Sequence, residues 1–533
     1  MLSMSAQRFA RRGRRAQVCD SKSRRIATRT PLAIIASLLV VISAAAHAAA
    51  PDLSAVVIRG STVYSAPELF FAYQNHLGKP ISQAGTRAIV AALGTRYESD
   101  GYARPRVQVD DALIAAGILR IDVYEPRLSE VTISGDPGPH LATLERLGFA
   151  LRDDGPLRQR DMQTTVRRMR ELPGLTLSAT TALDSDQPHA YRLDFDTEFE
   201  PVTGTVELSN RGIEEAGPNF VLGQVVANGF FDGRTDLGLQ FGAATDYDEY
   251  HGLGIVANVG IGDNGARTSF FGFRSRSNPH EAVLDRDDSY LRDRIRIGFS
   301  RPLPAVTDMT VALSAALRLD DLAIHRSAVR LRDERLRMLE LRSSLSWRRN
   351  SATQYASSLD VVKGLGGVGS GLTALDLIDD PRREDFVVTH FNLTRLTRFN
   401  ERWSVRLDAF AQQSAYVLPY DQRFKIGGDR LGRGFEVAEI AGDQGLGAKV
   451  EVRRRLPTAP AVLGRVSIHG FYDIGTAWKQ DLPGRESAAT AGVGFAVQNG
   501  RVSGTLEVAQ PLTHADVEGS TGLTLFVELV IAL

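Results

Sequence analysis

The sequence predicts two small α+β domains followed by a transmembrane antiparallel β-barrel of about 16 strands, in a chain of 533 residues. Three observations predict this fold. The first residues have the composition of an export signal, and a pattern of about 75 residues then occurs twice. The rest of the chain consists of short segments in which apolar and polar residues alternate, separated by turn residues, as is typical of outer-membrane barrels.

Residues 1–48 are predicted to be a signal peptide. Nine basic residues lie between Arg8 and Arg29, Pro31–Ala46 form a short apolar segment, and Ala46-His47-Ala48 fits the small-x-small cleavage rule. A retained N-terminal anchor is the alternative, but the apolar segment is shorter than a membrane-spanning helix requires. We therefore expect the chain to be exported.

The predicted mature chain is acidic and lacks cysteine. Residues 1–48 hold nine of the 63 basic residues and one of the 63 acidic residues, which leaves 54 basic and 62 acidic residues and a net charge of −8. This charge disfavours nucleic acid as a partner, because phosphate binding needs clustered positive surface. The only cysteine, Cys19, lies in the predicted signal peptide, and the ten histidines are at least 29 positions apart. The sequence therefore predicts no disulfide, thiolate site or local metal motif.

Residues 52–125 and 126–200 are predicted to be two similar α+β domains. Val56–Gly60 in the first copy returns as Val131–Gly135 in the second, at a spacing of 75 residues. Each copy continues with two helical stretches and two strands, which is an α+β order, although pattern alone also fits an unrelated small domain. The predicted closing strands are Arg104–Val109 with Ile118–Tyr124 and Thr176–Thr181 with Tyr191–Glu198.

The first helix of the first copy has a start signal in the sequence. Ser65 and Glu68 have the spacing of a capping box, Pro67 lies in the first turn, and Gly78 lies just past the predicted helix end. We therefore expect an α-helix to begin at Ser65.

Residues 201–533 are predicted to form the barrel. Asp232-Gly233 and Asn499-Gly500 are typical hairpin turns between alternating segments. The last segment, Leu523–Leu533, places six aliphatic residues on one side and Glu528 on the other. A water-soluble β-sandwich is the alternative, but the export signal and the strand number favour a closed barrel, which satisfies its own backbone in lipid.

Two segments near the C-terminus are predicted to meet inside the barrel. The segment at about 418–447 is rich in glycine and is predicted to be a long loop rather than a strand. In Arg465–Ala477 the alternation places Asp473 opposite an aliphatic stripe, as expected for a strand residue that faces the pore. A loop arginine, Arg433, can hold that carboxylate with two parallel hydrogen bonds. In a partly wet pore we expect the pair to contribute about 1 kcal/mol.

The two α+β copies resemble polypeptide-transport-associated (POTRA) domains. The resemblance rests on the strand–helix–helix–strand–strand order, on the Tyr97-x-x-x-Gly101-Tyr102 ending of the long helix and on the Leu172-Pro173-Gly174 ending in copy two. Two such domains before a barrel resemble the outer-membrane transporter of two-partner secretion, the haemolysin secretion/activation family.

The resemblance implies which residues hold the loop in the pore. In the family, the arginine of a loop tip, here Arg433-Gly434-Phe435, meets the aspartate of a strand motif, here Phe471-x-Asp473-x-Gly475. We call these six residues the loop–barrel lock. The family pattern also implies that Gly442, Asp443 and Gly445 support the loop. Gly432, inserted before the arginine, departs from the family pattern, and an unrelated surface arginine is the alternative interpretation.

The resemblance also implies the function and the partners. It implies a pore in the bacterial outer membrane, with the POTRA domains in the periplasm, that moves an unfolded exoprotein of the large adhesin or haemolysin type to the cell surface. The other expected partners are outer-membrane lipid and the barrel-assembly machinery during biogenesis. The alternatives are a factor that inserts other barrels, which usually carries three or more POTRA domains, and a passive diffusion channel.

No catalytic activity and no cofactor are predicted. Gly364–Gly369 matches G-x-G-x-x-G, but no strand–helix–strand unit surrounds it, so a flexible barrel loop is the preferred interpretation. The segment Gly442–Gly447 lacks the lysine of a P-loop. No nucleophile elbow or clustered acid and base is found in the sequence, so we do not expect an enzyme.

Overall fold

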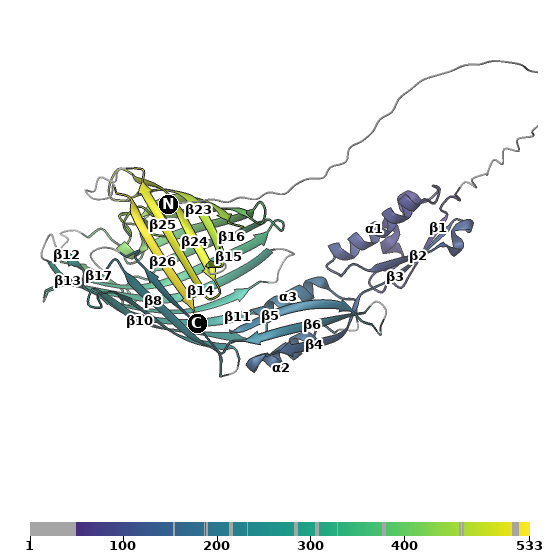
Figure 1. Ribbon diagram of the computed structural model, residues 1–533, viewed down its shortest axis with the longest axis horizontal. Helices are drawn as coiled ribbons and strands as arrows, with labels where there is room; N and C mark the ends of the chain where they lie inside the picture. The colour runs from purple at the N-terminus through teal and green to yellow at the C-terminus, as the bar shows by residue number, and fades with distance from the viewer. Residues whose placement is uncertain are drawn as a thin grey trace, which may run out of the picture. The chain divides into compact units, whose positions relative to one another are not determined.

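The structure is a computed structural model with two α+β domains and a closed β-barrel (Figure 1). It describes residues 50–533 except 153–154, 186, 188–189, 213–216, 232, 282–285, 304–308, 328, 376–379, 458–459, 461–462 and 514–521. The predicted signal peptide at 1–48 lies outside these described residues. Among the described helices, none is long and apolar enough to cross a membrane.

The first α+β domain has a three-stranded sheet in the order β1-β3-β2, with β1 parallel and β2 antiparallel to the central β3. Leu93 and Tyr97 of helix α1 are fully buried against Leu119 and Ile121 of β3, because one face of the helix is apolar. The elements are β1 (Ala55–Arg59), η1 (Pro67–Ala72), η2 (Gln74–His76), α1 (Gln83–Ser99), β2 (Arg106–Asp110), η3 (Asp111–Ala116) and β3 (Ile118–Tyr124).

The expected α-helix after Ser65 is wrong, because the chain forms two short 3₁₀ helices there. The Glu68 carboxylate accepts hydrogen bonds from the Ser65 backbone N–H at 2.8 Å and from the Ser65 hydroxyl at 2.7 Å. The Glu68 N–H donates to the Ser65 carbonyl at 3.1 Å, which is the i to i+3 spacing of a 3₁₀ turn. The hydroxyl is therefore turned to the carboxylate and does not cap the backbone.

The second domain repeats the same topology, with the sheet order β4-β6-β5. Its central strand β6 contributes the buried Leu193 and Phe195, against which Leu144 of α2 and Met169 of α3 pack. The elements are β4 (Arg127–Gly135), η4 (Gly138–His140), α2 (Leu141–Phe149), α3 (Gln159–Arg170), β5 (Leu175–Leu183) and β6 (Ala190–Phe199).

A buried carboxylate holds the first domain together at the end of its sheet. Glu125 accepts hydrogen bonds from the Tyr97 hydroxyl at 2.6 Å and from the backbone N–H groups of Thr62 at 2.8 Å and Val63 at 3.1 Å; the Thr62 hydroxyl also donates to it. Burial would raise the pKa of Glu125, but these hydrogen bonds to the charged form prevail and lower the pKa from its ordinary 4.5.

We expect Glu125→Gln to destabilise the first domain by about 2 kcal/mol at neutral pH, because charged hydrogen bonds are lost. Since the folded pKa of Glu125 is depressed, its stabilisation is complete above about pH 4.5 and is lost as the pH falls through the folded value. Hydrogen exchange of residues 55–124 in the full-length chain, corrected for the intrinsic rate at each pH, measures both effects. Equal protection of variant and wild type at pH 7 would contradict this role.

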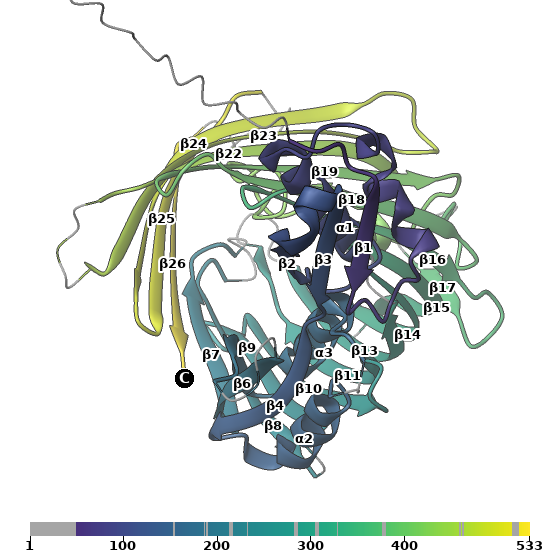
Figure 2. The ribbon, with the colours of Figure 1, turned by 90° about the vertical axis from the view of Figure 1, so that its right-hand side faces the viewer.

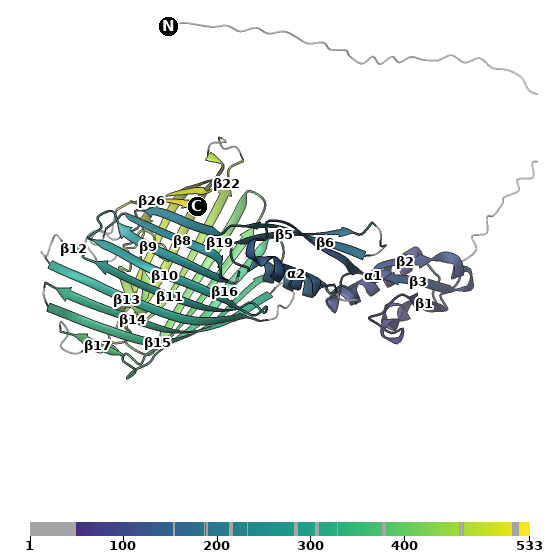
Figure 3. The same ribbon diagram turned by 90° about the horizontal axis from the view of Figure 1, so that it is seen from below.

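The barrel consists of sixteen long antiparallel strands within the described residues, in agreement with the predicted number. It closes where the last strand, β26, pairs with the first, β7, and Figure 2 shows these two strands side by side. Strands β8 to β15 form a continuous slanted wall (Figure 3). The long strands are β7 (Val202–Ser209), β8 (Phe220–Phe230), β9 (Thr235–Ala244), β10 (Tyr250–Ile261), β11 (Ala266–Ser277), β13 (Arg286–Pro302), β14 (Met309–Arg326), β15 (Val329–Arg348), β16 (Thr353–Gly364), β18 (Val387–Arg398), β19 (Trp403–Ser414), β22 (Gln444–Arg455), β23 (Arg465–Trp478), β24 (Glu486–Asn499), β25 (Val502–Pro511) and β26 (Thr524–Ala532).

Two short strands extend this ladder. Strand β12 (His280–Glu281) pairs with β13, and β17 (Gly371–Ala374) pairs with β15.

The predicted alternation of faces is present in β23. Ile468, Tyr472 and Ile474 are exposed on the outer face, whereas Asp473 is buried on the inner face. An apolar outer band with polar residues inside is what a lipid-facing barrel requires.

Candidate functional site: a loop held inside the barrel

The loop between β19 and β22 forms the candidate site. It contains the 3₁₀ turn η5 (Tyr420–Gln422) and two short strands, β20 (Phe424–Ile426) and β21 (Ile440–Gly442), which pair with each other. The segment predicted as a long loop thus lies between two barrel strands and contains two short strands that the sequence did not indicate. Three-residue strands flanked by glycine are too short to produce a detectable alternation in the sequence.

Apolar side chains hold this loop against the inner wall. Five loop residues are almost fully buried together with Ala477 of β23 and Ala488 of β24. The small alanine side chains leave room on the wall, and burial of each large loop side chain contributes about 1.5–3 kcal/mol. The five loop residues are Phe424, Ile426, Leu431, Phe435 and Ile440. Docking of the loop therefore has a hydrophobic basis besides its charges.

At the tip of the loop, Arg433 and Asp473 are in direct contact. The Arg433 Nε and Nη2 donate to the two Asp473 oxygens at 3.1 and 3.0 Å, which is a two-bond fork. The backbone N–H groups of Gly432 and Arg433 also donate to Asp473, at 3.2 and 3.3 Å. Gly432 has φ +86°, a conformation that glycine adopts without strain. The inserted glycine thus turns the backbone so that it binds the same carboxylate.

The Arg433 guanidinium is enclosed on its other sides too. Its Nη1 lies 3.1 Å from Glu507 Oε1 and 3.5 Å from Glu451 Oε2, and its Cζ lies 3.5 Å from the centre of the Phe471 ring. Arg433 is 5% exposed and Asp473 0%. The expectation of a wet, weakly contributing pair is therefore wrong. Removing one partner leaves an uncompensated buried charge, which costs about 3–5 kcal/mol.

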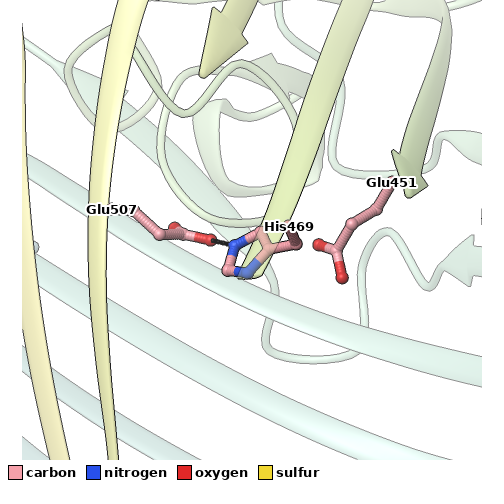
Figure 4. A group of neighbouring side chains, drawn as sticks. All are labelled: Glu451, His469 and Glu507. Atoms are coloured by element: carbon pink, nitrogen blue, oxygen red, sulfur yellow. Dashed lines mark hydrogen bonds and ion pairs between the residues drawn. The ribbon is translucent and has the colours of Figure 1, made fainter. Parts of the chain in front are cut away.

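Two carboxylates and a histidine from strands β22, β23 and β25 lie around the guanidinium. Glu451 of β22, His469 of β23 and Glu507 of β25 point toward a common space (Figure 4), and His469 Nε2 lies 2.7 Å from Glu507 Oε1. The intervening β24 places Gly494 between them, where a Cβ would lie 2.4 Å from the His469 ring. Ligand atoms of the three residues lie within 4.8 Å of one another, so they have the spacing to hold a metal ion. A metal ion there would compete with Arg433 for the same carboxylate oxygens.

The glycines of the two motifs allow close packing between loop and wall. A Cβ on Gly475 would lie 2.8 Å from Leu431 Cδ2 and 3.0 Å from Ile426 Cδ1. A Cβ on Gly434 would lie 2.9 Å from a Thr490 methyl and 3.0 Å from the Pro511 nitrogen. Real Cβ atoms rarely come this close to other atoms, so a side chain at Gly475 has to displace the ends of Leu431 and Ile426, and one at Gly434 meets the backbone of Pro511.

The predicted support residues lie at the base of the loop. Asp443 is fully buried, and its two carboxylate oxygens accept the backbone N–H groups of Leu418 at 2.7 Å and Gln480 at 2.8 Å. Asp443 therefore ties the start of the loop to the end of β23. A Cβ on Gly442 would lie 2.6 Å from the Trp478 nitrogen, and one on Gly445 would lie 2.1 Å from the Phe424 ring. All nine predicted site residues thus lie in or against the docked loop.

Sequence reasoning missed Glu507, Glu451 and Arg211 as site residues. Glu507 is 74 positions from Arg433 in the sequence and belongs to no motif. The signal that would have found it is the alternation in β25, where Glu507 is a charged residue between the apolar Leu506 and Val508. Arg211 follows the end of β7 and donates a hydrogen bond to Glu507, and no pattern in the sequence connects it to the loop tip.

Two family models match the chain. Residues 309–497 match the haemolysin secretion/activation protein ShlB/FhaC/HecB, and residues 52–125 match the ShlB-type POTRA domain. The chain is similar to the outer membrane transporter CdiB of Escherichia coli, with 23% identity over 520 residues, 90% of this chain and 82% of that protein. The CdiB of Dickeya dadantii is 21% identical over 436 residues, 78% of this chain and 75% of that protein.

Solved structures show the same fold. CdiB from Escherichia coli has a TM-score of 0.74 and 19% identity, covering 92% of both chains. CdiB from Acinetobacter baumannii has a TM-score of 0.65 and 13% identity, covering 91% of this chain and 90% of that one. The predicted POTRA-plus-barrel fold is thereby confirmed, and the two family models confirm the predicted resemblance.

Proposed function

We propose that this chain, which carries the barrel and POTRA domains of the haemolysin secretion/activation family, is the outer-membrane pore of a two-partner secretion pair. It passes an unfolded exoprotein from the periplasm, where its POTRA domains lie, to the cell surface. The observation that supports this most is the docked loop, which occupies the pore and is held by one enclosed arginine, Arg433. A pore filled by a displaceable segment fits regulated passage of a chain better than free diffusion of solutes.

The POTRA domains are proposed to receive the exoprotein in extended form. In each three-stranded sheet the outer strands, β1 and β2 or β4 and β5, pair with the central strand on one side only. An extended segment adds to such an edge through main-chain hydrogen bonds, with little demand on its sequence. This mode suits an unfolded exoprotein of the large adhesin or haemolysin type, because any extended segment of a long chain offers the same main-chain groups.

The remaining partners follow from the fold. The exposed aliphatic outer face of the strands requires outer-membrane lipid, and strand β26, with its outward Leu525 and Val527, is the segment we propose the barrel-assembly machinery engages during biogenesis. No nucleotide or cofactor is needed in this proposal, because folding of the exoprotein outside the cell drives its passage.

Deleting the gene separates a secretion pore from a factor that inserts other barrels. We expect the deletion strain to lose one large surface or culture protein while other outer-membrane barrels keep their abundance, as measured by quantitative proteomics of both fractions. Complementation with the wild-type chain restores the lost protein. A general fall in outer-membrane barrels with no loss of a single exported protein would contradict the proposal and favour an insertion factor.

A further inference from the structure

The pairing that closes the barrel is its shortest ladder. Strands β26 and β7 face each other over five residue pairs, from Ala532 opposite Thr205 to Glu528 opposite Ser209. Strand β26 faces its other neighbour, β25, over eight pairs, and no other pair of neighbouring long strands in the described barrel has fewer than eight. Because each ladder step adds backbone hydrogen bonds, we expect this seam to be the weakest line of the barrel wall.

Beyond the end of β7, the hydrogen bonds of Asn210 continue the contact between the first and the last strand of the barrel. The Asn210 side chain binds both backbone groups of the opposite strand: its Nδ2 donates to the Leu525 carbonyl at 2.9 Å, and its oxygen accepts the Val527 N–H at 2.7 Å. The Asn210 backbone N–H also donates to the Val527 carbonyl at 3.2 Å. The seam therefore depends on the residues that follow β7, not on the ladder alone.

Arg211, the next residue, spans the seam and also reaches the docked loop. Its guanidinium carbon lies 4.5 Å from the centre of the Phe526 ring on β26, and its Nη2 donates to Glu507 on β25. Its Nη1 forms an ion pair of 2.6 Å with Asp429 of the loop. The Arg211 side chain is 10% exposed and that of Glu507 6%, so this pair is little screened by solvent. The Asp429 side chain is 61% exposed, so its ion pair with Arg211 is the weaker of the two.

Glu507 links this arginine to the loop tip. Its Oε2 accepts a hydrogen bond from Arg211, and its Oε1 lies 3.1 Å from Arg433 Nη1 and 2.7 Å from His469 Nε2. One carboxylate therefore holds the arginine of the seam and the arginine of the loop–barrel lock at the same time. If Arg433 moves away, Glu507 loses one of the contacts that fix its position. If the whole loop undocks, Arg211 also loses its ion pair with Asp429.

We propose that Arg211 is a positioning residue that couples docking of the loop to closure of the seam between β7 and β26. While the loop is docked, Asp429 and Glu507 hold Arg211 across β26. When the loop undocks, the seam becomes easier to open, so that the barrel wall loosens in the same step that clears the pore. This inference rests on the docked loop described above, and its test does not use secretion, so it stands or fails separately from the proposed function.

The test is hydrogen exchange of the seam amides, residues 205–209 and 527–532, in the full-length chain in detergent or nanodiscs. We expect Arg433→Ala, which touches no seam residue, to raise exchange at the seam about five-fold or more, the lower range of known couplings between sites. In the Arg211→Ala background, where the seam already exchanges faster, Arg433→Ala should add nothing. A seam unaffected by Arg433→Ala would overturn the proposal, because a purely local role for Arg211 predicts that result.

Two further variants keep the test decisive. Asp429→Asn leaves every barrel residue in place and weakens only the contact of Arg211 with the loop. We therefore expect faster hydrogen exchange at the seam in this variant, and it can be measured even if Arg211→Ala does not assemble. Exchange at the wild-type rate in Asp429→Asn would also overturn the proposal. Arg274→Ala is the matched control. It removes a two-bond arginine pair with Asp293 between β11 and β13, distant in the ladder from the seam, and the seam should exchange at the wild-type rate.

Discussion

Arg433→Ala is expected to leave the barrel assembled in the membrane and to abolish secretion of the exoprotein. The variant removes the guanidinium that neutralises Asp473, Glu507 and Glu451, which then face one another in a buried space. Loss of one member of a buried ion pair costs about 3–5 kcal/mol. The docked population of the loop should fall by a factor on the order of 10²–10³, while the strand ladders of the wall other than the seam between β7 and β26 stay intact.

The loop and the exported protein are measured separately. Protease accessibility of residues 424–442 in the purified chain reports undocking, single-channel conductance reports the opened pore, and quantitative immunoblotting reports secretion at matched membrane levels. Normal secretion by Arg433→Ala at a normal membrane level would contradict the assigned role. Arg430→Ala is the matched control on the same loop. Arg430 donates one hydrogen bond of 3.0 Å to the neutral side chain of Asn392 and lies 5.1 Å from the centre of the Phe410 ring, so its removal leaves no buried carboxylate without a partner and should retain most secretion.

A double-mutant cycle isolates the contact itself. Asp473→Ala alone leaves Arg433 buried without its fork partner, whereas Arg433→Ala with Asp473→Ala removes both charges of the pair. The double variant should therefore undock the loop less than the sum of the two single effects predicts, by about 1–3 kcal/mol. Additive effects would mean that the two residues act independently in spite of their contact.

Gly475→Val is expected to displace the loop without altering any charge of the lock. Its side chain would occupy the space of Leu431 and Ile426, which come within 3.0 Å of a Cβ at this position. Overpacking of this kind costs about 1–3 kcal/mol, and the loop can relieve it by leaving the wall. Valine itself suits a β-strand, so β23 and the barrel should assemble normally.

Gly470→Val is the matched control on the same strand. Gly470 lies on the opposite face from Gly475, and the nearest atom to a Cβ there is the Gly492 oxygen at 3.9 Å, an ordinary contact distance. We expect Gly470→Val to retain a docked loop and full secretion. Protease accessibility of the loop in both variants, at equal membrane levels, makes the comparison. A docked loop in Gly475→Val, or equal undocking in both variants, would contradict the close-packing role of Gly475.

Local patterns were sufficient to predict the fold class and one side of the site. The return of Val56–Gly60 as Val131–Gly135 indicated the repeated α+β unit, and period-two alternation in Arg465–Ala477 placed Asp473 on the inner face of β23. Both signals are properties of a few consecutive residues, because neighbouring side chains on a strand must point to opposite faces. The motif resemblance then paired Asp473 with Arg433.

Other parts of the site depended on contacts that no local pattern contains. The strength of the lock comes from burial between Phe471, Glu507 and the packed loop core, and the sequence led to the wrong expectation of a solvent-screened pair. Likewise, a 3₁₀ turn forms at Ser65 in place of the expected α-helix. The Ser65 N–H donates to Glu68 as in a capping box, but the Ser65 hydroxyl donates to the same carboxylate and does not accept from a backbone N–H.

The sequence by itself determined which residues are able to face the lumen, which segment is rich enough in glycine to fold into it, and that a carboxylate and an arginine are available there. Only the tertiary structure decided that Glu507 lies beside Arg433 and that Arg211 joins the loop to the closing strands. Strand direction is encoded locally, whereas neighbours across a barrel are set by the register of every ladder and by the closure of β26 on β7.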